Sequence, residues 1–171
     1  MSFSMYTASV PVFQHMLRNL SHLLDKGEAS AQARKFEPSV LATFRLAPDM
    51  LPFTRQILIA CDAAKNGIAR ISGVEAPKFE DNEASFPELK ARIQKTLDYL
   101  ATVPASAIDG TEDKQITFPV GREATRTMSA QAYLTTWALA NFFFHITTAY
   151  NILRHNGVDV GKADYLAGAA R

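Results

Sequence analysis

Residues 141–158, NFFFHITTAYNILRHNGV, carry a long apolar helical pattern interrupted by one histidine, and this stretch decides the fold. The pattern predicts a helix over 130–156 that ends before Gly157, a residue that commonly terminates helices. Residues at three- and four-residue spacing form one line along this helix: Leu134, Ala138, Asn141, His145, Thr148 and Ile152. The line lies at the centre of the apolar face, so Asn141 and His145 are predicted to point into the protein interior.

Three further helical patterns precede this one. The first covers 8–26 and is predicted to end at Gly27, and the second covers about 48–72. The third opens with a capping-box pattern, in which Ser85 is followed three residues later by Glu88. Four long helices in one chain predict an all-α fold, a four-helix bundle.

The segment between the third and fourth predicted helices has a different composition. KQITFPV (114–120) and EATRTMS (123–129) are rich in Thr, Ile, Phe and Val, which favours a short β-hairpin or an extended crossover. Pro119 restricts the first stretch to an edge strand. The Gly- and Ala-rich tail after Gly157 is expected to pack loosely against the end of the bundle.

Composition limits the class of protein. The 171 residues are most simply one domain, 1–171, and the net charge of +1 gives no electrostatic footprint for nucleic acid or an anionic membrane. No apolar run approaches the roughly 20 residues of a membrane span, and the first residues lack a signal-peptide pattern, so a cytoplasmic protein is expected by default. The single cysteine, Cys61, lies in an apolar helical run and is predicted to be a buried structural thiol.

A buried imidazole at position 145 has two explanations. An unpaired buried polar group costs about 1–3 kcal/mol, so Asn141 and His145 could simply pair with each other, with Thr148 or with polar groups of the second helix. Alternatively, His145 is a metal ligand or a general acid–base residue in a bundle cavity. Asp49 and Gln56 flank the apolar stripe of the second helix, and His15 and His22 fall opposite the stripe of the first, where solvated side chains are expected.

Three stretches of the chain resemble a known family: RLAPDMLPFTRQILIACDAAKNGIARISG, FPELKARIQKTLDYL and NFFFHITTAYNILRHNGVDVGKADYL. They are similar to an uncharacterised, largely bacterial family, known only as a domain of unknown function, within the DinB/YfiT-like superfamily of metalloenzymes. The resemblance implies a four-helix bundle with a divalent-metal site of three histidines. One histidine comes from the second helix and two from an HxxxH pair on the last, and several members are thiol-dependent transferases or hydrolases.

The resemblance also implies which residues occupy that site here. The final histidine of the superfamily precedes an "LR..G" ending, and the LRHNG of this chain places it at His145, with Asn141 in the partner position. The second helix offers no histidine, and Asp49 or Gln56 is its nearest polar residue. The implied site is therefore an altered one for a single divalent metal (Zn, Ni, Mn or Fe) or for none. Its residues are His145, Asn141 and Asp49 as metal ligands, with Gln56 and Thr148 as pocket residues.

Two functions remain open from the sequence. The first is a transferase- or hydrolase-type protein in which His145 is the catalytic residue. The second is a non-enzymatic small-molecule-binding or dimeric structural module whose buried histidine and asparagine are only structurally paired. The resemblance implies a homodimer, and the expected ligand is an unidentified small molecule.

Overall fold

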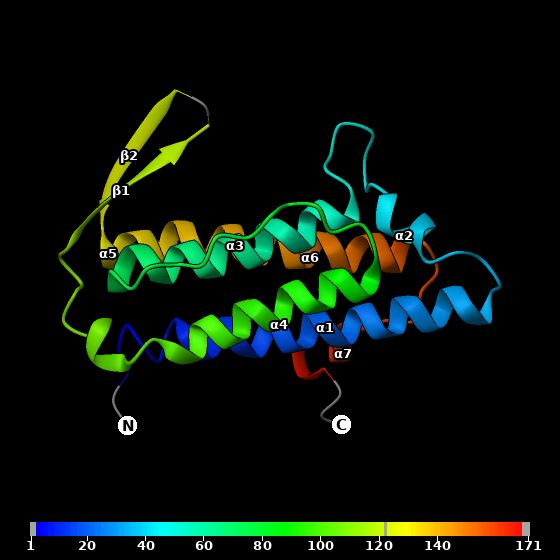
Figure 1. Cartoon of the computed structure of the whole chain (residues 1–171), viewed down its shortest axis with the longest axis horizontal. Helices are drawn as coiled ribbons and strands as arrows, with labels where there is room; N and C mark the ends of the chain where they lie inside the picture. Colours follow the sequence, from blue (N-terminus) through cyan, green and yellow to red (C-terminus); the bar gives the residue numbers. More distant parts are fainter. Residues whose placement is uncertain (1–2, 122, 169–171) are drawn as a thin grey trace.

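Four long helices form the body of the protein. The computed structural model describes residues 3–121 and 123–168, and its long helices are α1 (Val10–Ala33), α3 (Phe53–Ser72), α4 (Phe86–Thr102) and α6 (Leu139–His155). Figure 1 shows α3 and α6 side by side in one layer and α1 and α4 in the other. Their apolar faces meet in one core, which includes Phe13, Leu20, Ile57 and Ile146. None of the helices described is long and apolar enough to cross a membrane.

Local end signals mark the end of α3 and the start of α4 as predicted, whereas α3 begins at Phe53, later than the predicted start near residue 48. Gly73 ends α3 with a φ of 79°, a left-handed conformation that glycine adopts readily. Ser85 begins α4 with the predicted capping box, in which its side chain accepts from the Glu88 N–H while the Glu88 carboxylate accepts from the Ser85 N–H.

The predicted end of the first helix at Gly27 is wrong, because α1 continues to Ala33. A Cβ on Gly27 would lie 3.0 Å from Cε1 of Phe86 and 3.1 Å from Cδ2 of Leu153. The glycine therefore serves close packing between α1, α4 and α6 rather than helix termination. A short helix, α2 (Ser39–Thr43), lies in the connection that follows.

The last long helix is continuous but not uniform. A single α-helical turn, α5 (Ala130–Ala132), leads into a π-helical segment, η2 (Tyr133–Ala138), before α6 begins. The predicted limits of 130–156 thus agree with the structure to within one residue. The π-helical turn was not predicted, because the spacing of apolar residues does not distinguish it from an α-helical turn.

A β-hairpin stands out from the helices (Figure 1). Its strands, β1 (Gln115–Val120) and β2 (Ala124–Ser129), are antiparallel, and they follow a short 3₁₀ turn, η1 (Ala105–Ala107). The hairpin lies between α4 and the last long helix, α6. It does not lie between α3 and α4, because the structure contains an additional short helix, α2, that was not among the predicted helices. Phe118 anchors β1, with its ring 4.8 Å from that of Tyr133 and 5.0 Å from that of Trp137.

The C-terminal tail forms a helix, α7 (Lys162–Ala167), that is fastened to α1, so the expectation of loose packing is wrong. Asp164 is 5% exposed, and its carboxylate accepts from the Gly161 N–H at 2.7 Å and pairs with Lys26 Nζ at 3.1 Å and His22 Nε2 at 3.3 Å. His15 Nε2 lies 2.7 Å from the Leu166 carbonyl oxygen. The two histidines of α1, expected to be solvated, therefore contact α7.

The Asp164 carboxylate makes the stability of the protein sensitive to acid. Burial alone would raise the pKa of Asp164, but the Gly161 N–H, Lys26 and His22 hold the charged form and lower its pKa from 3.8 to about 2. Because the unfolded chain takes up this proton first, the contribution is complete above about pH 4 and is lost as the pH falls towards 2. The lost free energy of unfolding is about 2 kcal/mol.

Urea unfolding from about pH 5 to 2.5 measures this effect as a difference between variants. Asp164→Asn should flatten the acid limb of the wild-type profile by that amount. Asp159→Asn, in the same tail but exposed, is the matched control and should leave the profile unchanged. Parallel acid limbs for the wild type and Asp164→Asn would contradict the assignment.

Candidate functional site

His145 and Gln56 form a buried pair between α6 and α3. The His145 side chain is 8% exposed and Gln56 is 2% exposed, and His145 Nδ1 lies 2.7 Å from Gln56 Oε1. Gln56 Nε2 donates at 2.9 Å to the carbonyl oxygen of Leu51, which fixes the orientation of the amide. Since Oε1 can only accept, Nδ1 carries the hydrogen and Nε2 keeps its lone pair.

The surroundings of this pair keep the imidazole neutral. Burial lowers the pKa of His145 from 6.5 to about 4, because the charged form loses its hydration. The ring of Phe144 stands edge-on to the imidazole at 5.2 Å between centroids. Near neutral pH, His145 therefore presents an unprotonated Nε2 that can accept a hydrogen bond but holds a proton only weakly.

The other predicted site residues are less tightly gathered. Asn141 is exposed, so the prediction that it points into the interior is wrong, and Asp49 is exposed in the connection before α3. Thr148 is 4% exposed, and its hydroxyl donates at 2.7 Å to the Phe144 carbonyl oxygen of its own helix. Within the described residues, no hydrogen bond links any of the three to His145.

The error at Asn141 has a simple geometric cause. The buried residues of α6 are Phe142, His145, Ile146, Thr148, Ala149, Ile152 and Leu153. The centre of this face lies near Ala149, about 50° around the helix from the predicted line, which leaves Asn141 at its margin. Several adjacent apolar residues in NFFF make more than one line plausible, and periodicity alone does not choose between them.

A transition-metal centre does not fit the residues present. Over residues 3–121 and 123–168, no group of three or more His, Cys, Asp or Glu side chains is placed to hold a metal ion. His145 supplies one nitrogen, while Asn141 and Asp49 are exposed oxygen donors, a set poorly suited to zinc or nickel. We therefore derive no chemical step through a metal.

A charged cluster that the sequence reasoning missed lies between α3 and α4. Arg92 is 1% exposed, and its guanidinium donates to Asp62 at 2.9 Å, Glu83 at 3.0 Å and Asp81 at 3.2 Å. Burial alone would lower the pKa of Arg92, but Asp62 and Glu83 raise it. Because its charges are mutually paired, the cluster holds the connection before α4 in place, although the buried atoms Glu83 Oε2 and Arg92 Nε form no hydrogen bond within the described residues.

Phe79 sits within the same cluster. Lys65 Nζ lies 4.3 Å and the Arg92 guanidinium 4.6 Å from its ring centroid, both within cation–π range. Lys65 also pairs with Asp62 at 3.1 Å. The acidic run FEDNE (79–83), close before a helix that carries an arginine, was the available signal, but it did not identify the partner.

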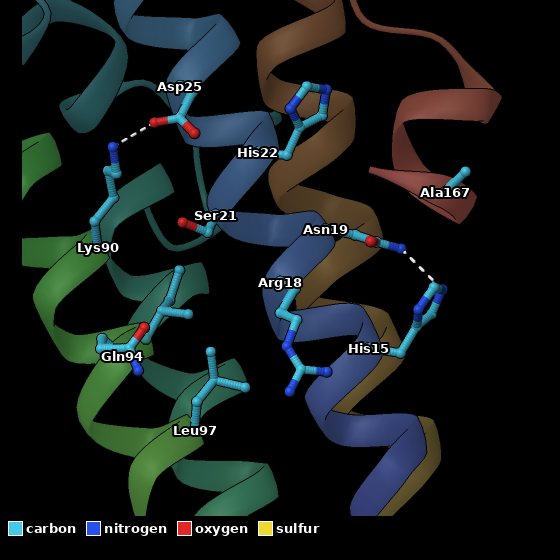
Figure 2. A pocket seen from close by; sticks show the side chains of 11 residues that line it. His15, Arg18, Asn19, Ser21, His22, Asp25, Lys90, Gln94, Leu97 and Ala167 are labelled. Carbon is cyan, nitrogen blue, oxygen red and sulfur yellow. Dashed lines mark hydrogen bonds and ion pairs between the residues drawn. The ribbon is translucent and has the colours of Figure 1, made fainter. Parts of the chain in front are cut away.

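A groove of about 430 Å³ lies between α1, α4 and α7 (Figure 2). The figure shows Arg18, Ser21 and Asp25 of α1 on the side of Lys90, Gln94 and Leu97 of α4, and His15 and His22 on the side of α1 towards α7. Several of its polar groups are already used: Lys90 pairs with Asp25, and the two histidines contact α7 or its neighbours. His15 and His22 thus hold α7 against α1, and in the part of the chain that the structure describes they belong to no group of side chains that could hold a metal ion.

A second hollow, of about 260 Å³, lies where the hairpin meets α3 and α6. Its aromatic lining residues are the partly exposed Trp137 and the buried Phe118, and its polar lining residues are Asp62, Asn66, Arg70 and Asn141. Asn141 is four residues, about one helical turn, before His145 on α6. This hollow and the His145–Gln56 pair are therefore neighbouring features of the α3–α6 face.

Comparisons with known proteins place the chain in a family. The family model described as "Domain of unknown function (DUF1993)" matches residues 5–166, so the chain belongs to that family. The crystal structure of a DinB family member protein from Shewanella denitrificans is 41% identical, with a TM-score of 0.87 over 95% of this chain and 91% of that one. A search of curated proteins found no match. These findings confirm the resemblance and the DinB-like fold.

Proposed function

We propose that this protein binds a small molecule at His145, whose Nε2 accepts a hydrogen bond from an O–H, S–H or N–H group of the ligand. The observation that carries the proposal is the 2.7 Å contact between Nδ1 and Gln56 Oε1. Together with the anchoring of Gln56 on Leu51, it selects one tautomer and leaves one acceptor. In many protein sites, one ring nitrogen of a histidine binds the ligand while a neighbouring side chain forms a hydrogen bond with the other ring nitrogen.

The side chains beside this pair favour a ligand that is partly apolar. Phe144 is 56% exposed and Leu51 is 43% exposed, both unusually accessible for large apolar residues. Phe144 contacts the imidazole edge-on, and Leu51 holds Gln56 through its carbonyl group. A ligand with one donor group and an apolar body would match these neighbours.

The tautomer is the first thing to measure. Long-range ¹⁵N NMR of the histidine rings should show His145 protonated at Nδ1 and unprotonated at Nε2, without titration between about pH 5.5 and 8.5. Gln56→Glu should raise the pKa of His145, because a carboxylate beside Nδ1 stabilises the imidazolium. Gln56→Leu should abolish the tautomer preference. A wild-type His145 that titrates near pH 6.5 would refute the proposed environment.

Ligand binding is tested with three probes that share a benzene ring. Benzyl mercaptan and benzyl alcohol carry a donor group, whereas toluene does not. The first two should shift the Nε2 resonance of His145 and toluene should not, and His145→Phe should weaken binding of the two donor probes only. Equal responses to all three probes, or unchanged binding to His145→Phe, would contradict a hydrogen-bonding role.

A thiol-dependent transferase or hydrolase is the second candidate, and the unprotonated Nε2 is the observation that favours it. A bound thiol can pass its proton to Nε2, its sulfur can then form a bond to the electrophilic carbon of a substrate, and the bond from this carbon to its leaving group breaks, as with chloride in an aryl chloride. The weak basicity of His145, with its pKa of about 4, makes this the less favoured function. Catalysed reaction of glutathione with dinitrochlorobenzene that His145→Phe abolishes, and that falls only below about pH 5, would support it over simple binding.

A further inference from the structure

We propose that the hollow between the hairpin, α3 and α6 is a binding site for a planar ring that carries a neutral amide. This site is distinct from the acceptor role of His145 and is argued from its own lining. It measures about 260 Å³, enough for a ligand of one ring with a small substituent. Its lining comes from α3, from the end of β1 with Gly121, and from the π-helical segment with α6.

The charged residues of the hollow are already engaged. Asp62 binds Arg92 at 2.9 Å and Lys65 at 3.1 Å, and Arg70 donates to the Tyr133 hydroxyl at 2.8 Å. A charged ligand would have to compete with these contacts. The lining therefore favours a neutral one.

Two carboxamides of the lining have no such engagement. Asn66 on α3 and Asn141 on α6 form no hydrogen bond with any residue in the described part of the chain. Each offers an N–H donor and a carbonyl acceptor. The complementary ligand group is one that also has a donor and an acceptor side by side, as an amide or a ring lactam has.

The exposed part of Trp137 specifies the rest of the ligand. Its ring packs at 5.0 Å and a tilt of 54° on that of Phe118, which is itself only 2% exposed, and the Arg126 guanidinium lies 5.7 Å from the Trp137 ring. Aromatic side chains beside free amide groups favour planar, unsaturated rings over puckered ones. The ring and the amide together define the ligand class.

The backbone around Trp137 supports a functional role for the hollow. Trp137 belongs to the π-helical segment Tyr133–Ala138, and such turns within α-helices frequently occur at functional sites. Gly67 of α3 lies beside Ala138, and an added Cβ would make an ordinary van der Waals contact with the Ala138 Cβ at 3.5 Å.

Trp137 is the only tryptophan of the chain, so its single indole N–H resonance reports on this site. Titration with benzamide should shift that resonance in a saturable way, with a dissociation constant on the order of millimolar for so small a probe. Benzoate tests the preference for a neutral group, and cyclohexanecarboxamide tests the preference for a planar ring. Benzoate and cyclohexanecarboxamide should each bind at least about fivefold more weakly than benzamide. A difference of this size in affinity is what the loss of one neutral hydrogen bond usually produces.

Variants then test the amides. Asn66→Ala and Asn141→Ala should each weaken benzamide binding about fivefold, and Asn151→Ala, on the same helix as Asn141 but outside the hollow, should not. Asn141 is exposed, so its replacement should leave folding intact, which a melting curve checks. An indole resonance that does not move, or benzamide binding that is unchanged in both variants or equalled by either control probe, would overturn the proposal.

Discussion

Replacing Arg92 with leucine is expected to lower the free energy of unfolding by about 3 kcal/mol. The substitution removes the only cation that contacts Asp62, Asp81 and Glu83 together within the described chain. The three carboxylates would then repel one another, and Glu83, whose side chain is only 12% exposed, would remain poorly hydrated. Removing one partner of a buried charge cluster costs more than removing the whole cluster, because the remaining charges have no compensation.

Arg55→Leu is the matched control for Arg92→Leu. Arg55 also binds Asp81, at 3.1 Å, but both side chains of that pair are about 40% exposed (40% and 42%). Exposed pairs contribute about 0–1 kcal/mol. Urea unfolding of both variants at neutral pH measures the two losses of unfolding free energy. Similar losses would show that the burial of Arg92 does not increase its contribution to stability.

Phe142→Ala is expected to cost about 3–5 kcal/mol. Phe142 is fully buried, and its ring packs edge-to-face on Phe13 at 4.7 Å and near Phe143 at 5.6 Å, so truncation leaves a cavity between α1 and α6. Phe144→Ala removes the same atoms two residues away, where the ring is 56% exposed, and should cost less than about 1 kcal/mol.

Thermal and urea unfolding of the two phenylalanine variants provide the measurement. The comparison is internal to one run of aromatic residues and therefore tests the rotation of α6 directly. If Phe144→Ala proved as costly as Phe142→Ala, the buried face of α6 would be centred where the sequence reasoning placed it. Asn141 would then point inwards.

The parts of the fold that local signals determine could be predicted from the sequence. Gly73 and the Ser85–Glu88 capping box act within their own turns, so the ends that they mark required no knowledge of the tertiary structure. The hairpin is one of the two alternatives that the strand-forming residues on both sides of a turn predicted, the other being an extended crossover. Gly27 failed as an end signal because its role depends on Phe86 and Leu153, which are distant in sequence.

The candidate site was predictable only in part, for the same reason. The spacing of apolar residues in α6 predicts that His145 is buried, and the position of Gln56 beside the apolar stripe of α3 predicts a pocket residue. Their hydrogen bond depends on how α3 and α6 are rotated against each other, which neither pattern contains. The Arg92 cluster could not be predicted, because its acidic partners come from α3 and from the connection before α4, which only the tertiary structure brings together.

Cys61 gives the protein a practical property. Burial raises the pKa of its thiol to about 12, despite the opposing influence of Thr96 and Arg92, so the thiolate that alkylating reagents attack is scarce in the folded chain. Cys61 is also the only cysteine. A cysteine introduced at the tip of the hairpin or on α7 would consequently be the one reactive thiol, and fluorophores or spin labels could be attached there without first removing a native residue.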